Sequence, residues 1–463
     1  MNAYKQAACD YIDSHSSLFT EASHKVWEYA ELSLMEYKSA AMYEKLLAEN
    51  GFEVESGMGG MKTAFCGKYG HGHPIIGILG EFDALSGLSQ KAAVPVRDPL
   101  EQGGTGHGCG HNMLGAGSLA AAFAVKDYLE KSGKEGTVIY YGCPGEEGGA
   151  GKAFLAKEHV WEQLDAAITW HPGDVYEVTS GTNVSCIQKE YKFTGLAAHA
   201  AGSPDKGRSA LDAVELMNIG VQFLREHMPS TARIHYAITD AGGNSPNVVQ
   251  PEAQVLYMVR DVQVSEALAL QKRVDKIAEA AAMMTDTSLK VRFIDGTANT
   301  VANSVLEKVV YANMQEIGIP AYTDADKEFA SAVVKSYDVP ATKLPGKGTQ
   351  EDPAIKALVK ELSANGTKPI NDYLIPLHHS DVASPGSTDV GDVSWQNVAC
   401  GNSPIGDKGL IAAGKYLAGI AIDLYEDPSI IEKAAVEHKE MTAQGYMCPI
   451  PEDAVPTPVG GKM

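Results

Sequence analysis

The stretch TVIYYGCPGEEGGAG, residues 137–151, runs from a β-branched and aromatic segment into a glycine-rich turn. The segment 137–141 has the composition and length of a buried strand. Glu146 and Glu147 therefore lie at the carboxyl end of a strand, where open α/β sheets build their sites. A solvated turn would also explain two charges among glycines. At a strand end, adjacent carboxylates can divide their work, because one can bind a cation while the other, with a shifted pKa, moves protons.

The composition is that of an ordinary globular protein. Of 463 residues, 44% are hydrophobic, which is enough for the cores of about two to four domains. The 38 basic and 59 acidic residues give a formal charge of -21, so we expect neither a nucleic-acid partner nor an anionic membrane partner. The amino terminus lacks a basic segment followed by an apolar one, which favours a cytoplasmic protein. Seven scattered cysteines do not form a disulfide framework, and we expect all except Cys109 to be reduced and mostly structural.

The amino-terminal part of the chain alternates between helical and strand patterns. Apolar positions recur at helical spacing from about 2 to 50, and Gly51 ends this segment as a C-cap. A glycine-rich loop followed by an Ala/Leu-rich helix occupies 104–133. The strands expected here are 52–55, 63–69, 74–80, 137–141 and 166–170. This alternation predicts an α/β catalytic domain with a mixed sheet flanked by helices.

A second pattern interrupts this domain. Between about 185 and 300 the expected order is strand, helix, strand, strand, helix, strand, which is the ferredoxin-like βαββαβ signature. Because helix-rich sequence resumes after Asn303, we interpret 185–300 as an inserted domain and 1–184 with 301–463 as the two parts of the catalytic domain. The tail after Cys448 contains four prolines and is expected to be an extended strap.

A second glycine-rich segment carries candidate metal ligands. GHGCGH, residues 106–111, places Cys109 and His111 two positions apart, directly before a helix. A thiolate and an imidazole are good ligands for borderline divalent metals, and this spacing in an extended loop lets both reach one ion. His171 closes another strand and is a third candidate at the same sheet edge. The alternatives are a merely buried cysteine and a structural histidine, but together with the glutamate pair the pattern favours metal.

Asp83 follows an apolar strand in GEFDAL, residues 80–85. One interpretation is that its carboxylate orients or tunes a metal ligand. The other is that it caps the amino terminus of a helix. The sequence supports both interpretations equally.

The order of these motifs resembles one family of metal-dependent amidohydrolases and peptidases, that of carboxypeptidase G, hippurate hydrolase and the auxin-conjugate hydrolases. The motifs that carry the resemblance are EFDAL at 81–85, GCGHN at 108–112, PGEEGG at 144–149, WHP at 170–172 and AHA at 198–200. Further segments resemble the subgroup that contains the B subunit of aminobenzoyl-glutamate hydrolase and the related aminoacyl dipeptidases. These are RIHYAIT at 233–239, SPNVVQ at 245–250 and PGSTDVGDVSW at 385–395. The resemblance covers nearly the whole chain.

The resemblance implies a metal-dependent hydrolase of the amide bond in a small N-acyl or aminoacyl amino acid, such as p-aminobenzoyl-glutamate or a dipeptide. It implies that Cys109, His111, Glu147 and His171 hold one or two divalent ions, Zn or Mn. Glu146 is then the general base, which takes a proton from the attacking water and delivers it to the leaving amine. The cation lowers the pKa of that water and polarises the carbonyl, which a lone carboxylate cannot do.

Other candidate residues lie in the inserted domain and in the loop after it. His199 matches a histidine that in dimers of this family reaches the partner's active site and stabilises the oxyanion, so the resemblance implies a homodimer with the inserted domain as lid and dimerisation domain. Asn247 could bond the substrate, Arg260 could hold a substrate carboxylate bidentately, and Gly386 and Ser387 could offer backbone donors. The alternatives are an exposed loop histidine, a structural ion pair and an ordinary turn.

The chain departs from the family at one point. Members usually carry a last metal-binding histidine after the Gly-Ser-Thr-Asp stretch, but residues 395–409 contain none. Either His378 or His379 substitutes, or the site holds a single metal, or the loop and the activity have been lost. Two further hypotheses follow: an amidase with Cys109 as nucleophile, and an impaired subunit that stabilises an active partner.

Overall fold

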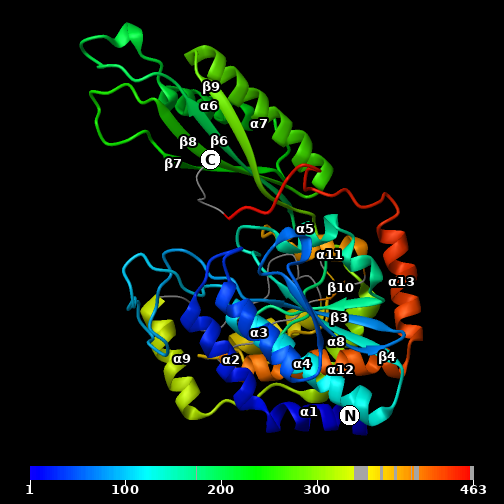
Figure 1. Cartoon of the computed structure of the whole chain (residues 1–463). Helices are drawn as coiled ribbons and strands as arrows, with labels where there is room; N and C mark the ends of the chain where they lie inside the picture. The colour runs from blue at the N-terminus through cyan, green and yellow to red at the C-terminus, as the bar shows by residue number, and fades with distance from the viewer. Residues whose placement is uncertain are drawn as a thin grey trace.

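The computed structural model of Figure 1 describes residues 1–173, 175–337, 353–364, 369–379, 383–397, 399–400 and 406–458. Its named strands form a six-stranded sheet in the lower body and a four-stranded sheet in the part that stands above it. The predicted α/β class, with a helix-flanked mixed sheet and an insertion of βαββαβ order, is confirmed.

The six-stranded sheet forms the centre of the lower body. Its strands are β1 (Glu53–Ser56), β2 (Phe65–His71), β3 (Ile75–Glu81), β4 (Gly136–Cys143), β5 (Ala166–Ile168) and β10 (Ala399–Cys400). The order is β1-β2-β4-β3-β5-β10, with β4, β3, β5 and β10 parallel and β1 and β2 antiparallel at one edge. Val138 and Tyr140 pack into one hydrophobic cluster, and Ile139 and Tyr141 pack into another. Both faces of β4 are therefore buried, which is why its sequence is almost continuously apolar.

Helices cover both faces of this sheet. One cluster joins the sheet to α1 (Ala3–Ser14), α2 (Ser16–Tyr29), α3 (Tyr37–Glu49), α4 (His111–Ser132), α8 (Ser304–Ile317) and α12 (Gly406–Glu426). The opposite cluster contains side chains of α5 (Gly151–Lys157) and α11 (Val390–Gln396). The remaining helices are α9 (Asp324–Tyr337), α10 (Pro353–Ala364), α13 (Ser429–Met441) and the 3-10 turns η1 (Met58–Gly60), η2 (Val160–Gln163) and η3 (Pro204–Lys206).

The upper sheet has the order β7-β8-β6-β9, and all its neighbours are antiparallel. Its elements in chain order are β6 (Ser185–Thr194), α6 (Ala210–Arg225), β7 (Arg233–Asp240), β8 (Glu252–Asp261), α7 (Val264–Thr285) and β9 (Ser288–Thr297). Side chains of α6 and α7 pack with those of the strands in one hydrophobic cluster. We call this part of the molecule the lid. Strand β7 lies at an edge, and most of its residues are exposed.

After α13 the described chain, which reaches residue 458, returns to the junction between the lower body and the lid (Figure 1). The Tyr446 hydroxyl donates to Asp392 Oδ1 at 2.6 Å, and Ile450 is buried in the cluster that contains α5. The predicted extended strap after Cys448 is thus packed on the lower body. Every helix in the described ranges is too short or too polar to span a bilayer.

Candidate metal and catalytic site

The glycine-rich loop before α4 brings two predicted ligands together. Gly110, between Cys109 and His111, has a φ of 79°, which L side chains rarely adopt. A Cβ at this position would also lie 2.9 Å from Met113 and 3.0 Å from Pro172. Glycine therefore permits the sharp turn that places the Cys109 thiol and the His111 ring at the same end of the sheet.

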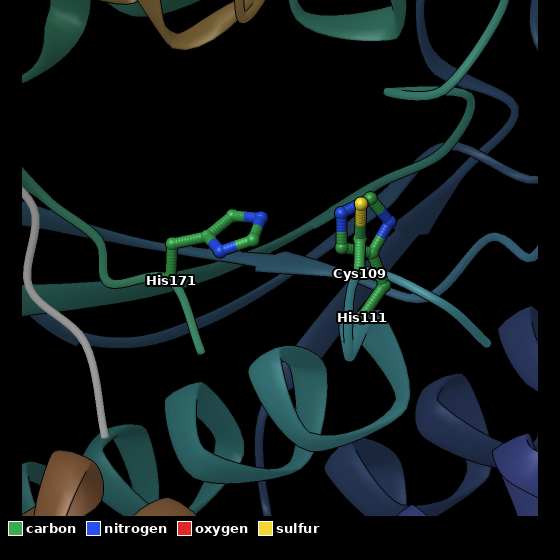
Figure 2. Close-up of side chains that lie close together, drawn as sticks. All are labelled: Cys109, His111 and His171. Atoms are coloured by element: carbon green, nitrogen blue, oxygen red, sulfur yellow. The ribbon is translucent and has the colours of Figure 1, made fainter. Parts of the chain in front are cut away.

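His171 reaches the same point from the loop after β5. Donor atoms of Cys109, His111 and His171 all lie within 4.8 Å of one another, and Figure 2 shows the His171 ring extending toward the other two side chains. Its Nδ1 donates to the Pro172 carbonyl at 2.7 Å, so the Nε2 lone pair is available to a cation. The structure thus brings three of the four predicted metal ligands into one group.

Asp83 fixes the orientation of His111. His111 Nδ1 donates to Asp83 Oδ1 at 2.8 Å, and Asp83 Oδ2 accepts from Ser33 Oγ and from the backbone N–H of Glu147. Burial alone would raise the pKa of Asp83, but the His111 charge and these hydrogen bonds lower it to about 2. The geometry matches the orienting interpretation of Asp83. Within the described ranges the next helix begins only at His111, so the helix-cap interpretation is wrong.

The adjacent glutamates serve different neighbours. Glu146 Oε2 lies 3.9 Å from His111 Nε2, and its side chain is 13% exposed. Burial and the Glu81 charge raise the pKa of Glu146 well above its usual value. The Glu147 carboxyl group instead interacts with the Cys109 thiol, and burial raises the pKa of Glu147. Glu147 belongs to neither of the two potential metal-binding groups found among the described residues.

Glu81 is a site residue that sequence reasoning missed. Glu81, His111 and Glu146 form a second group whose donor atoms lie within 4.8 Å of one another. Glu81 Oε2 lies 3.2 Å from His111 Nε2, and within the described structure both buried atoms lack a hydrogen-bond partner. The available signal was a glutamate at the end of an apolar core strand, two positions before Asp83.

Lys152 is the second missed residue. Its ammonium lies 2.6 Å from Glu81 Oε1 and 2.5 Å from Asp389 Oδ1, and all three side chains are at most 2% exposed. Its backbone N–H also donates to Asp389 Oδ2 at 2.9 Å. Burial would lower the pKa of Lys152, but Asp389 and Glu81 raise it well above its usual value, so the ammonium stays charged.

The other predicted site residues form two smaller sets. In the lid, His199 is exposed, it forms a β-bridge with Val248, and the N–H of Ala200 donates to the Asn247 carbonyl. At the junction with the lower body, Arg260 donates to Ser387 Oγ at 2.7 Å. The adjacent Gly386 uses its carbonyl to accept from Val184, and it is exposed.

Neither histidine named as a substitute for the missing ligand joins the metal groups. His378 Nδ1 donates to the Pro376 carbonyl at 3.0 Å, and His379 Nδ1 lies 3.0 Å from Ser180 Oγ. Among the described residues, the two potential metal-binding groups consist of Cys109, His111 and His171, and of Glu81, His111 and Glu146. Residues 398 and 401–405 of the segment without a histidine lie outside the described ranges.

A cavity of about 1080 Å³ adjoins Cys109. Its wall includes Trp27, Leu100, Met113 and Phe329, and the Trp27 ring stacks on His107. Small-molecule sites are typically concave, mostly apolar and of this order of volume. The cavity therefore gives a small substrate access to the thiol side of the metal group.

Comparison with known proteins identifies the family. The model of peptidase family M20/M25/M40 matches residues 77–370. The B subunit of the p-aminobenzoyl-glutamate hydrolase of Escherichia coli K12 is 38% identical over 97% of this chain and 98% of its own length. The Xaa-Arg dipeptidase of Mus musculus is 26% identical over 68% of this chain and 72% of its own.

Solved structures share the fold. An aminobenzoyl-glutamate utilization protein from Klebsiella pneumoniae matches with a TM-score of 0.61 and 15% identity, over 89% of this chain and 97% of that one. A dinuclear metal-binding peptidase from Bacillus subtilis matches with a TM-score of 0.54 and 16% identity, over 89% and 99%. With the family model and the Escherichia coli relative, these findings show that the chain belongs to peptidase family M20/M25/M40 and is an amide-bond hydrolase.

Proposed function

We propose that this chain hydrolyses the amide bond of a small N-acyl or aminoacyl amino acid, with p-aminobenzoyl-glutamate and dipeptides as the leading substrates. The observation that carries the proposal is the group Cys109, His111 and His171 beside the buried carboxylate of Glu146. The names of the relatives from Escherichia coli and Mus musculus support this substrate class.

The residues of the site fit a divalent cation. A thiolate and imidazoles suit Zn, whereas carboxylates suit harder ions such as Mn. The buried His111 Nε2 and Glu81 Oε2, which lack hydrogen-bond partners in the described structure, are atoms that a cation would satisfy. The two potential metal-binding groups share His111, so the site could hold one ion or two. The structural neighbour from Bacillus subtilis is described as a dinuclear metal-binding peptidase. A bound ion would lower the pKa of the attacking water and polarise the amide carbonyl.

Glu146 is the proposed general base. Its carboxylate is close enough to the His111 group to take a proton from the attacking water and to pass it to the leaving amine. Asp83 holds His111 with Nε2 toward the group, and Glu147 contacts the Cys109 side of the site. The two adjacent glutamates thus act on opposite sides of one centre.

Substrate recognition is assigned to the lid and the loop after it. Arg260 is placed to pair with a substrate carboxylate beside Ser387, with Gly386 and Asn247 as further contacts. His199 Nδ1 accepts from the backbone N–H groups of Ala201 and Gly202, so Nε2 carries the hydrogen. That form of the ring can donate to an oxyanion.

We also propose a homodimer formed through the lid. Strand β7 offers an exposed edge with Tyr236 and Ile238, and exposed edges pair readily with another chain. A partner of different sequence is a further candidate, since the Escherichia coli relative is named as the B subunit of its enzyme, and the A subunit from the same strain is 26% identical over 48% of this chain.

The six cysteines with described side chains are free thiols, which supports a reducing, cytoplasmic location.

One alternative function retains support. The absence of a histidine from 395–409 favours an impaired subunit that stabilises an active partner. The Cys109 nucleophile is less favoured, because burial and the nearby Glu147 raise the pKa of its thiol and disfavour the thiolate.

The test is metal content by mass spectrometry, paired with hydrolysis of p-aminobenzoyl-glutamate and a dipeptide panel before and after chelation. We expect bound metal and turnover that is lost on chelation and restored by Mn or Zn. Turnover that resists chelators but is lost on alkylation would point to Cys109 as nucleophile. Inert protein after full metal loading would favour the impaired subunit.

A further inference from the structure

Lys152 connects two parts of the site that come from distant regions of the sequence. Glu81 ends strand β3, whereas Asp389 precedes α11, and 237 residues separate Asp389 from Lys152. One ammonium contacts both carboxylates at 2.6 and 2.5 Å. With its Oε1 held by Lys152, Glu81 keeps its Oε2 beside His111 Nε2.

The other end of this connection reaches the residues assigned to the substrate. Asp389 follows Ser387 by two positions, and Ser387 Oγ accepts from Arg260 of the lid. Both Asp389 oxygens are occupied by Lys152, one by its ammonium and one by its backbone N–H. The position of the Gly386–Ser387 loop therefore depends on the same side chain that holds Glu81.

The physical cost of this arrangement favours a role beyond stability. Glu81 and Asp389 are fully buried carboxylates that repel each other, and the Lys152 charge compensates both. Apolar side chains of similar volume often hold elements together as well as a buried ion cluster does. The Lys152 cluster lies directly beside the potential metal-binding groups, where the position of the Glu81 carboxylate affects how a cation is held.

We infer that Lys152 is a positioning residue that holds the carboxylate of Glu81 at the metal group and the Gly386–Ser387 loop at the substrate, so that its loss weakens metal and substrate binding together. The inference rests on the proposed function for its substrate part, but not for its metal part.

The chain offers a matched control. Lys5 is also buried, and its ammonium also bridges two carboxylates, Glu316 at 3.0 Å and Asp423 at 2.7 Å. This second cluster joins α1 to α8 and α12, away from the metal group. A lysine-to-methionine change at either position removes one ammonium that contacts two carboxylates. Only the change at Lys152 lies beside the metal group.

The experiment compares Lys152→Met with Lys5→Met and the wild type. Mn²⁺ affinity is measured by calorimetry on chelator-treated protein, KM and kcat on p-aminobenzoyl-glutamate, and thermal stability by circular dichroism. We expect Lys152→Met to weaken Mn²⁺ binding by about tenfold or more, a usual cost of losing a group that orients a metal ligand. We expect its KM to rise as well. Lys5→Met should lower only the thermal stability.

A second variant keeps the test decisive if Lys152→Met does not fold. Asp389→Asn retains an acceptor for the Lys152 backbone but removes the charge that ties the substrate loop to the ammonium, so its KM should rise. An unchanged KM there, or Lys152→Met with the Mn²⁺ affinity and KM of Lys5→Met, would overturn the inference. If the wild type binds Mn²⁺ but hydrolyses no substrate, the proposed function fails, and the Mn²⁺ comparison alone decides the role of Lys152.

Discussion

The charged side chains of the candidate site and those on the surface of the lid differ in burial and in the number of partners that they share. At the edge of the six-stranded sheet, Glu81, Asp83, His111 and Lys152 are at most 2% exposed, and they share partners. On the lid surface, Lys192 and Glu252 form a one-to-one pair that is partly in solvent, at 21% and 52% exposure.

Exposed pairs and buried, shared charges tolerate substitution to different extents. Exposed ion pairs are worth about 0–1 kcal/mol and can be exchanged freely. Buried, shared charges are costly unless every member stays in place. Under the proposed function the lower sheet carries the chemistry, while the lid contributes through Arg260 and His199, the residues proposed to contact the substrate. Single substitutions in the two regions test that division.

The largest effect is expected from Glu146→Gln. Without a carboxylate to take and return the proton, turnover should fall by about 10²–10⁴-fold while metal content stays unchanged. Hydrolysis assays with metal analysis on the same sample measure both quantities. Glu158→Gln, an exposed change just after α5, is the control. A Glu146→Gln variant with the wild-type rate would remove Glu146 from the mechanism.

A smaller effect is expected from Asp295, which is a buried carboxylate in the lid. Burial, together with the Asp389 charge, raises its pKa from 3.8 to about 7, although Arg260 opposes the rise. Since the folded protein holds this proton more tightly than the unfolded chain, the stabilisation is full below about pH 3.8 and is lost as pH rises through about 7.

Asp295→Asn should therefore flatten the pH dependence of unfolding between pH 4 and 7. At about 1.4 kcal/mol for each pKa unit, the difference from the wild type is on the order of 4 kcal/mol at most. Urea denaturation at a series of pH values gives this difference. Parallel curves for the two proteins would show that Asp295 titrates normally in the fold.

Arg260→Met tests the lid without touching the metal group. Losing a charge-assisted contact costs about 1.5–3 kcal/mol, so kcat/KM should fall by roughly one to two orders of magnitude. Metal affinity should not change. Arg233, the exposed cross-strand neighbour of Arg260 in β7, provides the control variant Arg233→Met. Equal losses in the two variants would argue against a specific role for Arg260.

The smallest effect belongs to the lid surface. Glu252→Gln removes the exposed pair with Lys192 and should change the free energy of unfolding by less than about 1 kcal/mol. Chemical denaturation measures this, and activity should stay at the wild-type level. A loss of several kcal/mol would show that the lid depends on its charges as the lower sheet does.

Local sequence patterns predicted most of the fold. The strand expected at 74–80 is β3, and the strand expected at 52–55 is β1, each within one residue at either end. Both predictions use periodicity, which depends on neighbouring residues only. The grouping of Cys109, His111 and His171 was also accessible, because carboxyl ends of parallel strands meet at one edge.

Ion pairs between residues far apart in the chain could not be predicted from local sequence patterns. Lys152 and Glu81 lie in ordinary glycine-rich and apolar segments, and their importance comes from Asp389, which lies more than half the chain away from Glu81. No periodic pattern links such positions. The absence of His378 and His379 from the two metal groups likewise follows from loop paths that no local pattern encodes.

The lid is built from one continuous segment, whereas the six-stranded sheet takes its last strand, β10, from near the end of the chain. Helix α12, which packs on α4, is also translated late. During synthesis the lid can fold as soon as residue 297 has left the ribosome. The catalytic body must wait for more than a hundred further residues, and until then the part of the apolar surface of α4 that α12 covers stays exposed. The nascent chain therefore covers this apolar surface last, when the folded lid is already attached.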